Sequence, residues 1–197
     1  MVAELVTERR SARIAEVLSR RQPTLTILVE AVSKPHNVAA ILRSCDAVAV
    51  GTLHLIAPTP LALSAAVSAS AARWVETVRW DSAQVALAAL KQRGFQLVAT
   101  HLGAQSQDFR ALDYCRPTCF LLGAERWGLS EAALALADHN VQIPMLGMVP
   151  SLNLSVAAAL LLFEAQRQRA AAGLYATQQL EAAEFQRLSR LWRSQES

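Results

Sequence analysis

The sequence predicts an α/β domain built on a mainly parallel sheet with helices on both faces. Short apolar runs typical of buried strands alternate along the chain with longer runs of helical periodicity. The expected strands are apolar almost throughout, as in a parallel sheet that is covered on both sides. The chain contains no internal repeat and no low-complexity linker. One domain with helical extensions at its two ends is therefore expected.

The N-terminal half begins with an amphipathic helix, because Ile14, Val17 and Leu18 are apolar among Glu and Arg. Pro23 ends this helix, and the run TILV that follows predicts a buried strand. Five further elements are expected on the same grounds of periodicity and apolar content. In order, the expected elements are a helix over 3–21, a strand over 26–29, a helix over 36–50, a strand over 53–56, an Ala/Ser-rich helix over 61–72, a strand over 75–78 and a helix over 82–93.

The C-terminal half repeats the alternation after Gly94, which is typical of a helix end. A long apolar helix closed by Gly173 and a last amphipathic helix complete the chain. The expected elements are strands over 95–100, 118–122 and 141–143 and helices over 130–137, 153–172 and 178–193. The expected division is an N-terminal basic extension over 1–22, a central domain over 23–172 and a C-terminal helical extension over 173–197.

The composition of the 197 residues, 53% hydrophobic and 18% charged, excludes a disordered chain. No apolar run reaches the roughly 18–20 residues of a membrane span, and the charged N-terminus does not resemble a signal peptide. The three cysteines, Cys45, Cys115 and Cys119, form an odd set without metal-ligand spacing. Reduced thiols and a cytoplasmic location are expected.

The net charge of +3 is confined to the two ends of the chain. Residues 1–21 hold five arginines and three glutamates, and residues 164–197 hold five arginines and four glutamates. Arginine supplies 17 of the 19 basic residues, and its planar fork suits phosphate oxygens. A nucleic-acid partner and a genome that replaces Lys by Arg throughout are both compatible with this composition.

Common catalytic signatures such as GxGxxG, GxxxxGK[ST], GxSxG and HExxH are absent from the sequence. The four histidines are scattered, so no metal site is expected, and His54 within an apolar strand is interpreted as structural.

Three stretches carry polar groups where a strand gives way to a helix. In KPHNVAAILRS, Asn37 could cap the next helix, with Arg43 and Ser44 about two turns later; an ordinary cap with a solvated Arg is the alternative. In FLLGAERWGLS, Glu125 should lie beyond the carboxyl end of a strand, where ligands of α/β sheets bind. Gly123 could let the backbone approach a ligand, or the two glycines could simply bracket a turn.

The third stretch, IPMLGMVPSLNLSVAAALLLF, ends a strand, passes through a Gly/Met/Pro loop and opens an apolar helix with Ser151 and Asn153. A helix start rich in small polar groups offers free N–H donors for an anion or for the polar edge of a cofactor. A well-capped buried helix is the alternative.

In this order, the three stretches resemble the three motifs of the SPOUT superfamily of RNA methyltransferases, and more closely its TrmH (SpoU) branch of tRNA 2′-O-ribose methyltransferases. Similarity extends over most of the chain up to about Tyr175. The positions that match the motifs are Asn37, Arg43 and Ser44; Gly123, Glu125 and Gly128; and Ser151, Asn153 and Ser155. Pro150 departs from the pattern, because close relatives usually carry Gln there.

The resemblance implies a deep C-terminal trefoil knot, here over about 95–168, whose loops bind S-adenosyl-L-methionine. It also implies a homodimer with the active site near the subunit interface, and no membrane or metal. The positions implied for cofactor binding are Thr100, Leu102, Gly123, Ile143, Leu152 and Asn153. The implied catalytic set is Arg43, Asn37, Glu125, Ser151 and Asn153.

The implied reaction is 2′-O-methylation of a guanosine in tRNA, at position 18 of the D-loop. A ribosomal-RNA 2′-O-methyltransferase of the same superfamily and a non-catalytic RNA-binding module are the alternatives. The branch grips tRNA through helical extensions, which gives the terminal arginines a use. The implied RNA-binding set is Arg9, Arg10, Arg13, Arg20, Arg21, Arg167 and Arg169.

Overall fold

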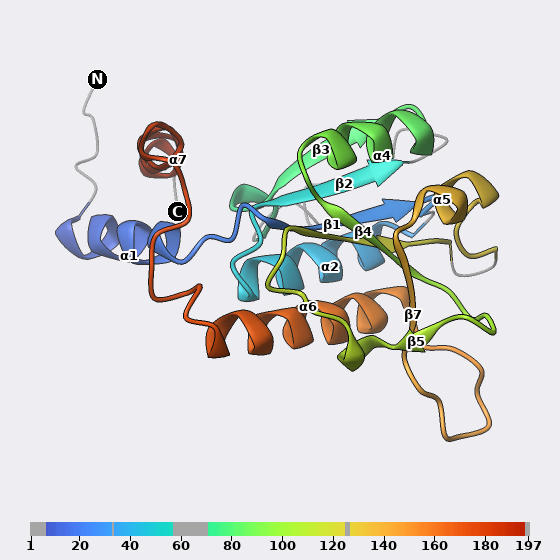
Figure 1. Cartoon of the computed structure of the whole chain (residues 1–197). Helices are drawn as coiled ribbons and strands as arrows, with labels where there is room; N and C mark the ends of the chain where they lie inside the picture. Colours follow the sequence, from blue (N-terminus) through green and yellow to red (C-terminus); the bar gives the residue numbers. More distant parts are fainter. Residues whose placement is uncertain (1–6, 33, 57–70, 125–126, 196–197) are drawn as a thin grey trace.

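The computed structural model describes residues 7–32, 34–56, 71–124 and 127–195. Its centre is a seven-stranded sheet in the order β3-β2-β1-β6-β4-β7-β5, in which every neighbouring pair is parallel (Figure 1). The strands are β1 (Leu25–Glu30), β2 (Thr52–Ile56), β3 (Glu76–Trp80), β4 (Gln96–Thr100), β5 (Gln107–Asp108), β6 (Thr118–Leu122) and β7 (His139–Gln142). The prediction of an α/β fold on a parallel sheet is confirmed.

Helices cover both faces of the sheet, and each face has its own apolar core. Helices α2 (Pro35–Ala47) and α6 (Leu154–Ala171) pack on one face, where Ile27 and Phe120 are completely buried. Helices α4 (Ala83–Gln92) and α5 (Glu131–Leu136) pack on the other, around Leu28 and Leu121. Because side chains alternate along a strand, successive residues such as Ile27 and Leu28 serve opposite cores.

The expected elements agree with the structure to within a few residues at their ends. Two short elements have no counterpart in the prediction: β5 and the 3₁₀ turn η2 (Phe109–Ala111). The helix expected over 61–72 falls largely outside the described residues, and its last two residues belong to the 3₁₀ turn η1 (Ala71–Arg73). The last helix begins at residue 182 rather than 178.

The order of the strands differs from their order in the chain. Strand β6 enters between β1 and β4, and β7 then pairs with the opposite side of β4. The carboxyl ends of β4 and β7, and the loops that follow them, therefore come together with the start of α6. The trefoil knot expected over about 95–168 stays a prediction.

The terminal helices α1 (Glu8–Ser19) and α7 (Ala182–Ser194) pack against each other beside the N-terminal ends of the strands (Figure 1). Ile14, Leu18 and Trp192 form the buried centre of this small cluster. The Arg10 guanidinium donates to the carbonyls of Trp192 and Gln195 at the end of α7, where helix carbonyls lack partners. Neither α1 nor α7 reaches the carboxyl edge of the sheet, where the cofactor loops were predicted. Among the described residues, no helix is long and apolar enough to cross a bilayer.

His54 is buried in β2 and has a structural role, as its sequence context suggested. Its Nδ1 accepts a hydrogen bond of 3.0 Å from Nε1 of Trp80 on the neighbouring strand. Burial, with a smaller contribution from Arg93, lowers the pKa of His54 to about 4 from its ordinary value of 6.5. The imidazole is therefore neutral in the folded protein at neutral pH.

We expect the pH dependence of stability to report this histidine. Between pH 6.5 and 4 the unfolded chain protonates His54 and the folded protein does not, so its contribution to stability is lost as the pH falls. At pH 5 the loss is about 2 kcal/mol. Urea denaturation of the wild type and of His54→Gln at pH 7.5 and pH 5 measures it. The two proteins should differ in their pH response by about this amount, and parallel responses would contradict the assignment.

Candidate functional site

A pocket of about 140 Å³ lies at the carboxyl edge of the sheet, between the loops after β4 and β7 and the segment before α6. It has apolar walls with a few polar groups between them. The residues around it are Thr100, His101, Leu102, Val141, Gln142, Ile143, Met145, Pro150, Ser151, Leu152 and Ala157. Four of the six positions predicted for the cofactor, Thr100, Leu102, Ile143 and Leu152, are among them. The structure thus brings together predicted positions, from Thr100 to Leu152, that are up to 52 residues apart in the sequence.

Asn153 links this pocket to the first motif. It is the N-cap of α6, and its Oδ1 accepts hydrogen bonds from the backbone N–H and the hydroxyl of Ser155 at 2.8 and 2.6 Å. Its Nδ2 donates to Oδ1 of Asn37 at 3.3 Å. The cap therefore holds one amide orientation, and that orientation joins the start of α6 to the start of α2.

Asn37 does not cap α2, which corrects the sequence interpretation. The helix begins at Pro35, and Lys34 occupies the cap position but does not cap the helix through its side chain. Pro is suited to the first helical position because its missing N–H would have no helical partner there. Asn37 lies inside the first turn with only 2% of its surface exposed, and its amide faces Asn153 rather than its own helix.

Arg43 and Ser44 lie on the next turns of α2. Arg43 is exposed, and it does not line the pocket at the carboxyl edge. The Ser44 hydroxyl donates to the carbonyl of Ala40 at 3.1 Å, a local bond within the helix. The single chain therefore unites Asn37 with Asn153 and leaves Arg43 on the surface.

The second motif forms a tight backbone loop. Ala124 and Gly128 exchange two hydrogen bonds, of 3.0 and 2.8 Å, and Gly128 has a φ of +69°. A Cβ at Gly123 would lie 1.9 Å from the backbone carbon of Gly128. Gly123 is thus required by the approach of its own chain, which supports the turn interpretation over approach of a ligand. Glu125 lies outside the described residues.

Glu30 is a polar residue of this edge that the sequence analysis did not single out. It ends β1, and its Oε2 accepts a 2.9 Å hydrogen bond from the N–H of Ser130, the N-cap of α5. The signal available in the sequence is a carboxylate at the end of an otherwise mostly apolar strand. Glu30 thus fixes the exit of the second-motif loop to the end of β1.

The residues predicted to bind RNA divide into exposed and buried arginines. Arg9, Arg13, Arg20 and Arg167 are exposed; Arg13 and Arg20 pair with Glu16, and Arg167 pairs with Glu164. Such surface ion pairs contribute little to stability because water and salt screen them, so a polyanion can replace the carboxylate. Arg10 is half-buried against the end of α7.

The structure contradicts the prediction for Arg169, which is completely buried. Its Nε donates to the carbonyl of Tyr114 at 2.8 Å, and its Nη1 donates to the side chains of Gln22 and Thr24 at 3.1 and 3.0 Å. Its Nη2 donates to the carbonyls of Thr24 and Arg116 at 2.8 and 2.9 Å. All its donors are engaged inside the protein, so none is available to an RNA phosphate.

Arg21 is likewise buried, with 2% of its surface exposed, and the prediction of RNA binding is wrong for it too. It donates to the carbonyls of Val50 and Trp74 at 2.8 Å and to the carboxylate of Asp46 at 3.0 Å. Its guanidinium lies 5.0 Å from the centre of the Trp192 ring. Arg21 therefore fastens the terminal helices to the domain.

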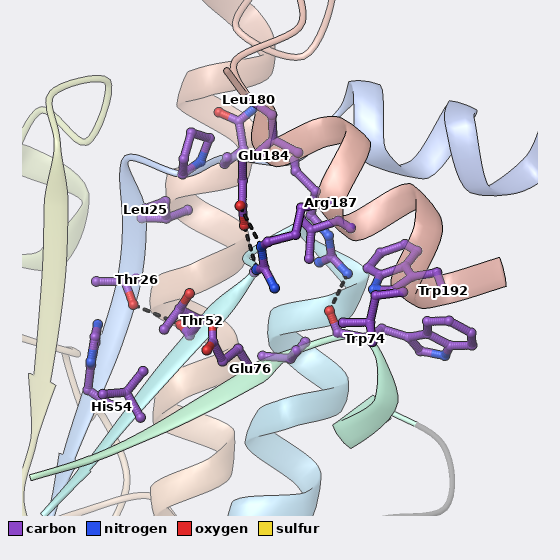
Figure 2. Close-up of a pocket in the computed structure, with 18 of the residues that line it drawn as sticks. Leu25, Thr26, Thr52, His54, Trp74, Glu76, Leu180, Glu184, Arg187 and Trp192 are labelled. Carbon is purple, nitrogen blue, oxygen red and sulfur yellow. Dashed lines mark hydrogen bonds and ion pairs between the residues drawn. The ribbon is translucent and has the colours of Figure 1, made fainter. Parts of the chain in front are cut away.

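A larger cavity, about 690 Å³, lies at the opposite edge of the sheet, between the first residues of β1–β3 and α7 (Figure 2). Arg187 projects into it and forms a two-bond ion pair with Glu184, at 2.7 Å for each bond. That hydrogen bonding raises the pKa of Arg187 and lowers the pKa of Glu184. None of the residues predicted for the cofactor lines this cavity. Within the described part of the chain, no three His, Cys, Asp or Glu side chains gather as metal ligands would.

Comparison with known proteins finds similar sequences that extend over most of the chain. Residues 24–163 match the family model described as the SpoU rRNA Methylase family. A tRNA (guanosine(18)-2′-O)-methyltransferase from Thermus thermophilus is 51% identical over 187 residues, which cover 94% of this chain and 96% of the relative. The enzyme of the same name from Escherichia coli is 50% identical over 182 residues, which cover 91% of this chain and 80% of the relative.

Two solved structures extend the comparison. The Aquifex aeolicus TrmH/SpoU tRNA modifying enzyme superposes with a TM-score of 0.89 at 38% identity, over 96% of this chain and 97% of that chain. The SpoU methyltransferase AviRb from Streptomyces viridochromogenes, solved in complex with AdoMet, superposes with a TM-score of 0.68 at 30% identity. That match covers 78% of this chain and 64% of that chain.

Arg167 and Arg169 form a matched pair for testing the division between surface and interior. Arg169→Lys leaves several buried carbonyls without a donor, and we expect it to lower the free energy of unfolding by about 3 kcal/mol or more. Arg167→Lys, on the surface two residues earlier, should leave the free energy of unfolding nearly unchanged. Urea denaturation of both variants measures the contrast, and equal effects would show that Arg169 has no anchoring role.

Proposed function

The chain belongs to the SpoU rRNA methylase family, and we propose that it methylates the ribose 2′ oxygen of guanosine 18 in the D-loop of tRNA, with S-adenosyl-L-methionine as methyl donor. The observation that carries this proposal is that the carboxyl-edge pocket adjoins the hydrogen bond between Asn37 and Asn153. That bond joins residues of the first and third motifs. The names of the two relatives that are about half identical to the chain support the choice of tRNA, of guanosine and of position 18.

The side chains and backbone groups around the pocket suit the adenosine part of the cofactor. Leu102, Ile143 and Leu152 provide apolar walls for a purine, and the strand ends and loops around them present backbone groups for its polar edge. We propose that Thr100 and Ser151 contribute polar contacts beside these walls. The tight turn at Gly123 would shape the neighbouring loop rather than touch the cofactor itself.

When bound, S-adenosyl-L-methionine supplies a methyl group on a sulfonium; the ribose 2′ oxygen takes the methyl group, the carbon–sulfur bond breaks and the hydroxyl proton leaves. The protein has to align the two reactants, which can lower the barrier by roughly 7–11 kcal/mol. In this proposal Asn37, Asn153 and Ser151 fix the loops that do so, and Glu125 completes the set from the second-motif loop.

Arg43 is the proposed catalytic residue, and its chemistry limits its role. A guanidinium with a pKa above about 12 does not accept a proton, so Arg43 would orient the hydroxyl and stabilise the charge that develops on its oxygen. The proton would pass to water or to an RNA phosphate. Because Arg43 is exposed in the single chain, substrate or a second subunit has to bring the reacting ribose to it.

The exposed arginines of α1 and of the end of α6 are proposed to hold the tRNA. Arg9, Arg13 and Arg20 on and after α1, and Arg167 on α6, can pair with phosphates. Arg10 belongs with them in position, although it also holds the end of α7. Phosphate contacts of this kind contribute affinity rather than base identity.

We further propose that two copies of the chain associate through α6. Its solvent face carries a stripe of Val156, Leu160 and Phe163, which are 46%, 40% and 50% exposed. The spacing of four and three residues places them on one side of the helix. Loop residues Leu146 and Met148, beside the start of α6, are completely exposed. An exposed apolar stripe of this kind on a helix is typical of a protein interface.

The proposed reaction is tested by incubating the protein with an unmodified tRNA transcript and S-adenosyl-L-methionine. Nuclease digestion and mass spectrometry should place one methyl group on the ribose of guanosine 18, and a transcript with 2′-deoxyguanosine at position 18 should accept none. A methyl group on a base, or transfer to ribosomal RNA alone, would refute the assignment. Binding of the cofactor with no transfer to any RNA would favour a non-catalytic module.

Replacement of Arg43 tests whether a guanidinium is needed. Arg43→Lys keeps the charge but loses the planar fork, so we expect kcat to fall by about 100-fold or more. The affinity for S-adenosyl-L-methionine and the stability should stay unchanged, because Arg43 is exposed and outside the pocket. Single-turnover methylation and cofactor titration separate these effects. Near-normal turnover would show that the guanidinium has no specific role.

A charge placed on the stripe of α6 tests the proposed dimer. Leu160→Glu should give a monomer in sedimentation at micromolar concentration and lower methylation, because a carboxylate in an apolar interface is not solvated. Val85→Glu is the control, since Val85 is 58% exposed on α4, away from the stripe. A wild type that sediments as a monomer, or a dimer that survives Leu160→Glu, would refute the interface.

A further inference from the structure

A groove lies between α1, η1 and the end of α7. None of the residues proposed for methyl transfer lines it. Its volume is about 590 Å³. Four separate parts of the chain contribute to it: α1 with its cap residue, the end of α2, the segment before β3, and the end of α7. The residues around it are Thr7, Arg9, Arg10, Arg13, Ile14, Val17, Asp46, Arg73, Trp74 and Trp192.

The groove is strongly cationic. Four arginines line it against a single carboxylate, that of Asp46. Asp46 already forms an ion pair of 3.0 Å with the buried Arg21, so its charge is compensated from inside the protein. Arg73 lines the same groove as the arginines of α1, although it is about 60 positions away from them in the sequence. Arginine forks that come from two separate segments to one groove suit the phosphates of a polyanion.

The groove also has an aromatic wall. Trp74 is half-buried and meets Trp192 edge to face, with 5.0 Å between ring centres and an interplanar angle of 68°. Arg21 donates to the carbonyl of Trp74 and lies over the Trp192 ring, so both indoles are held from the interior. A fixed indole between guanidinium groups is the arrangement that binds a nucleotide, because the base stacks while its phosphate pairs.

The groove and the methyl-transfer pocket lie at opposite ends of the parallel strands. The groove adjoins the segment that leads into β1 and β3, whereas the pocket follows the carboxyl ends of β4 and β7 (Figure 1). A free nucleotide can occupy only one of them. A folded RNA is long enough to contact both, which favours RNA over a small ligand as the occupant.

From this geometry we infer that the groove is a second RNA contact, which holds one nucleotide of the tRNA by stacking on Trp74 and by phosphate pairing with Arg9, Arg13 and Arg73. The inference rests on the proposed function and adds to it a specific docking point that includes residues outside the terminal helices. The nucleotide in the groove is remote from the methylated ribose. The contact therefore selects folded tRNA over short RNA that carries the same target sequence.

The test measures binding of an unmodified tRNA transcript by fluorescence anisotropy, without cofactor, over a range of salt concentrations. Arg73→Ala should weaken binding and lower the slope of log K against log salt by about 1. Trp74→Leu, which keeps an apolar contact with Trp192, should weaken binding by about 5- to 100-fold through loss of stacking. Methylation of a D-loop hairpin too short to reach the groove should be unchanged in both variants.

Arg190→Ala is the matched control, because Arg190 is exposed on α7 and does not line the groove. It removes the same charge, but from the exposed surface of α7 outside the groove. Equal losses for Arg73→Ala and Arg190→Ala would show diffuse attraction and overturn the inference, as would tRNA binding unaffected by Trp74→Leu. Thermal unfolding of each variant identifies any loss of tRNA binding that is due to misfolding. If Trp74→Leu misfolds, Trp74→Phe replaces it. We then expect a smaller loss of tRNA affinity, and unchanged affinity would overturn the inference.

The readout is independent of catalysis. A wild type that binds tRNA without methylating it refutes the proposed reaction but leaves the groove to be judged by its variants. A wild type that binds no tRNA, with or without cofactor, refutes the groove as an RNA contact and leaves a protein partner to be sought for this surface.

Discussion

The buried guanidinium of Arg169 holds together three segments that are distant in the sequence. Its five hydrogen bonds join the end of α6 to residues 22 and 24, before β1, and to residues 114 and 116, before β6. Burial lowers the pKa of this guanidinium, but its ordinary value is so high that it keeps its charge. Loss of the side chain would leave carbonyls in the interior without donors, which costs more than an ordinary hydrogen bond contributes.

This anchor acts at one end of α6, and the candidate site lies at the other. With its last turn fixed to the entrances of β1 and β6, the helix places its first turn at the carboxyl edge of the sheet. There the cap residue Asn153 meets Asn37, and the preceding loop closes against the ends of β4 and β7. The close packing of Gly123 on Gly128 shapes the adjoining loop. The site is thus a consequence of strand order and of one helix held at both ends.

The sequence predicted the alternation of strands and helices, because apolar periodicity reports burial directly. It predicted five of the eleven pocket residues, and these only through resemblance, since nothing local shows that residues 100–102 will meet residues 143–152. Arginine positions show the limit most clearly. Arg167 and Arg169 are two residues apart on one helix, hence about 200° apart around its axis, and one is exposed while the other is buried. Composition and spacing do not distinguish them, and the same holds for Arg20 and Arg21.

We assign the chemistry to the smaller pocket at the carboxyl edge and RNA docking to the groove at the opposite end. A crystal structure of the protein with S-adenosylhomocysteine tests the first assignment directly. We expect the adenosine between residues 100–102, 141–143 and 150–152, with the sulfur on the side of Asn37 and Asn153. Adenosine bound instead in the larger cavity beside α7, between Arg187 and the start of β2, would contradict it.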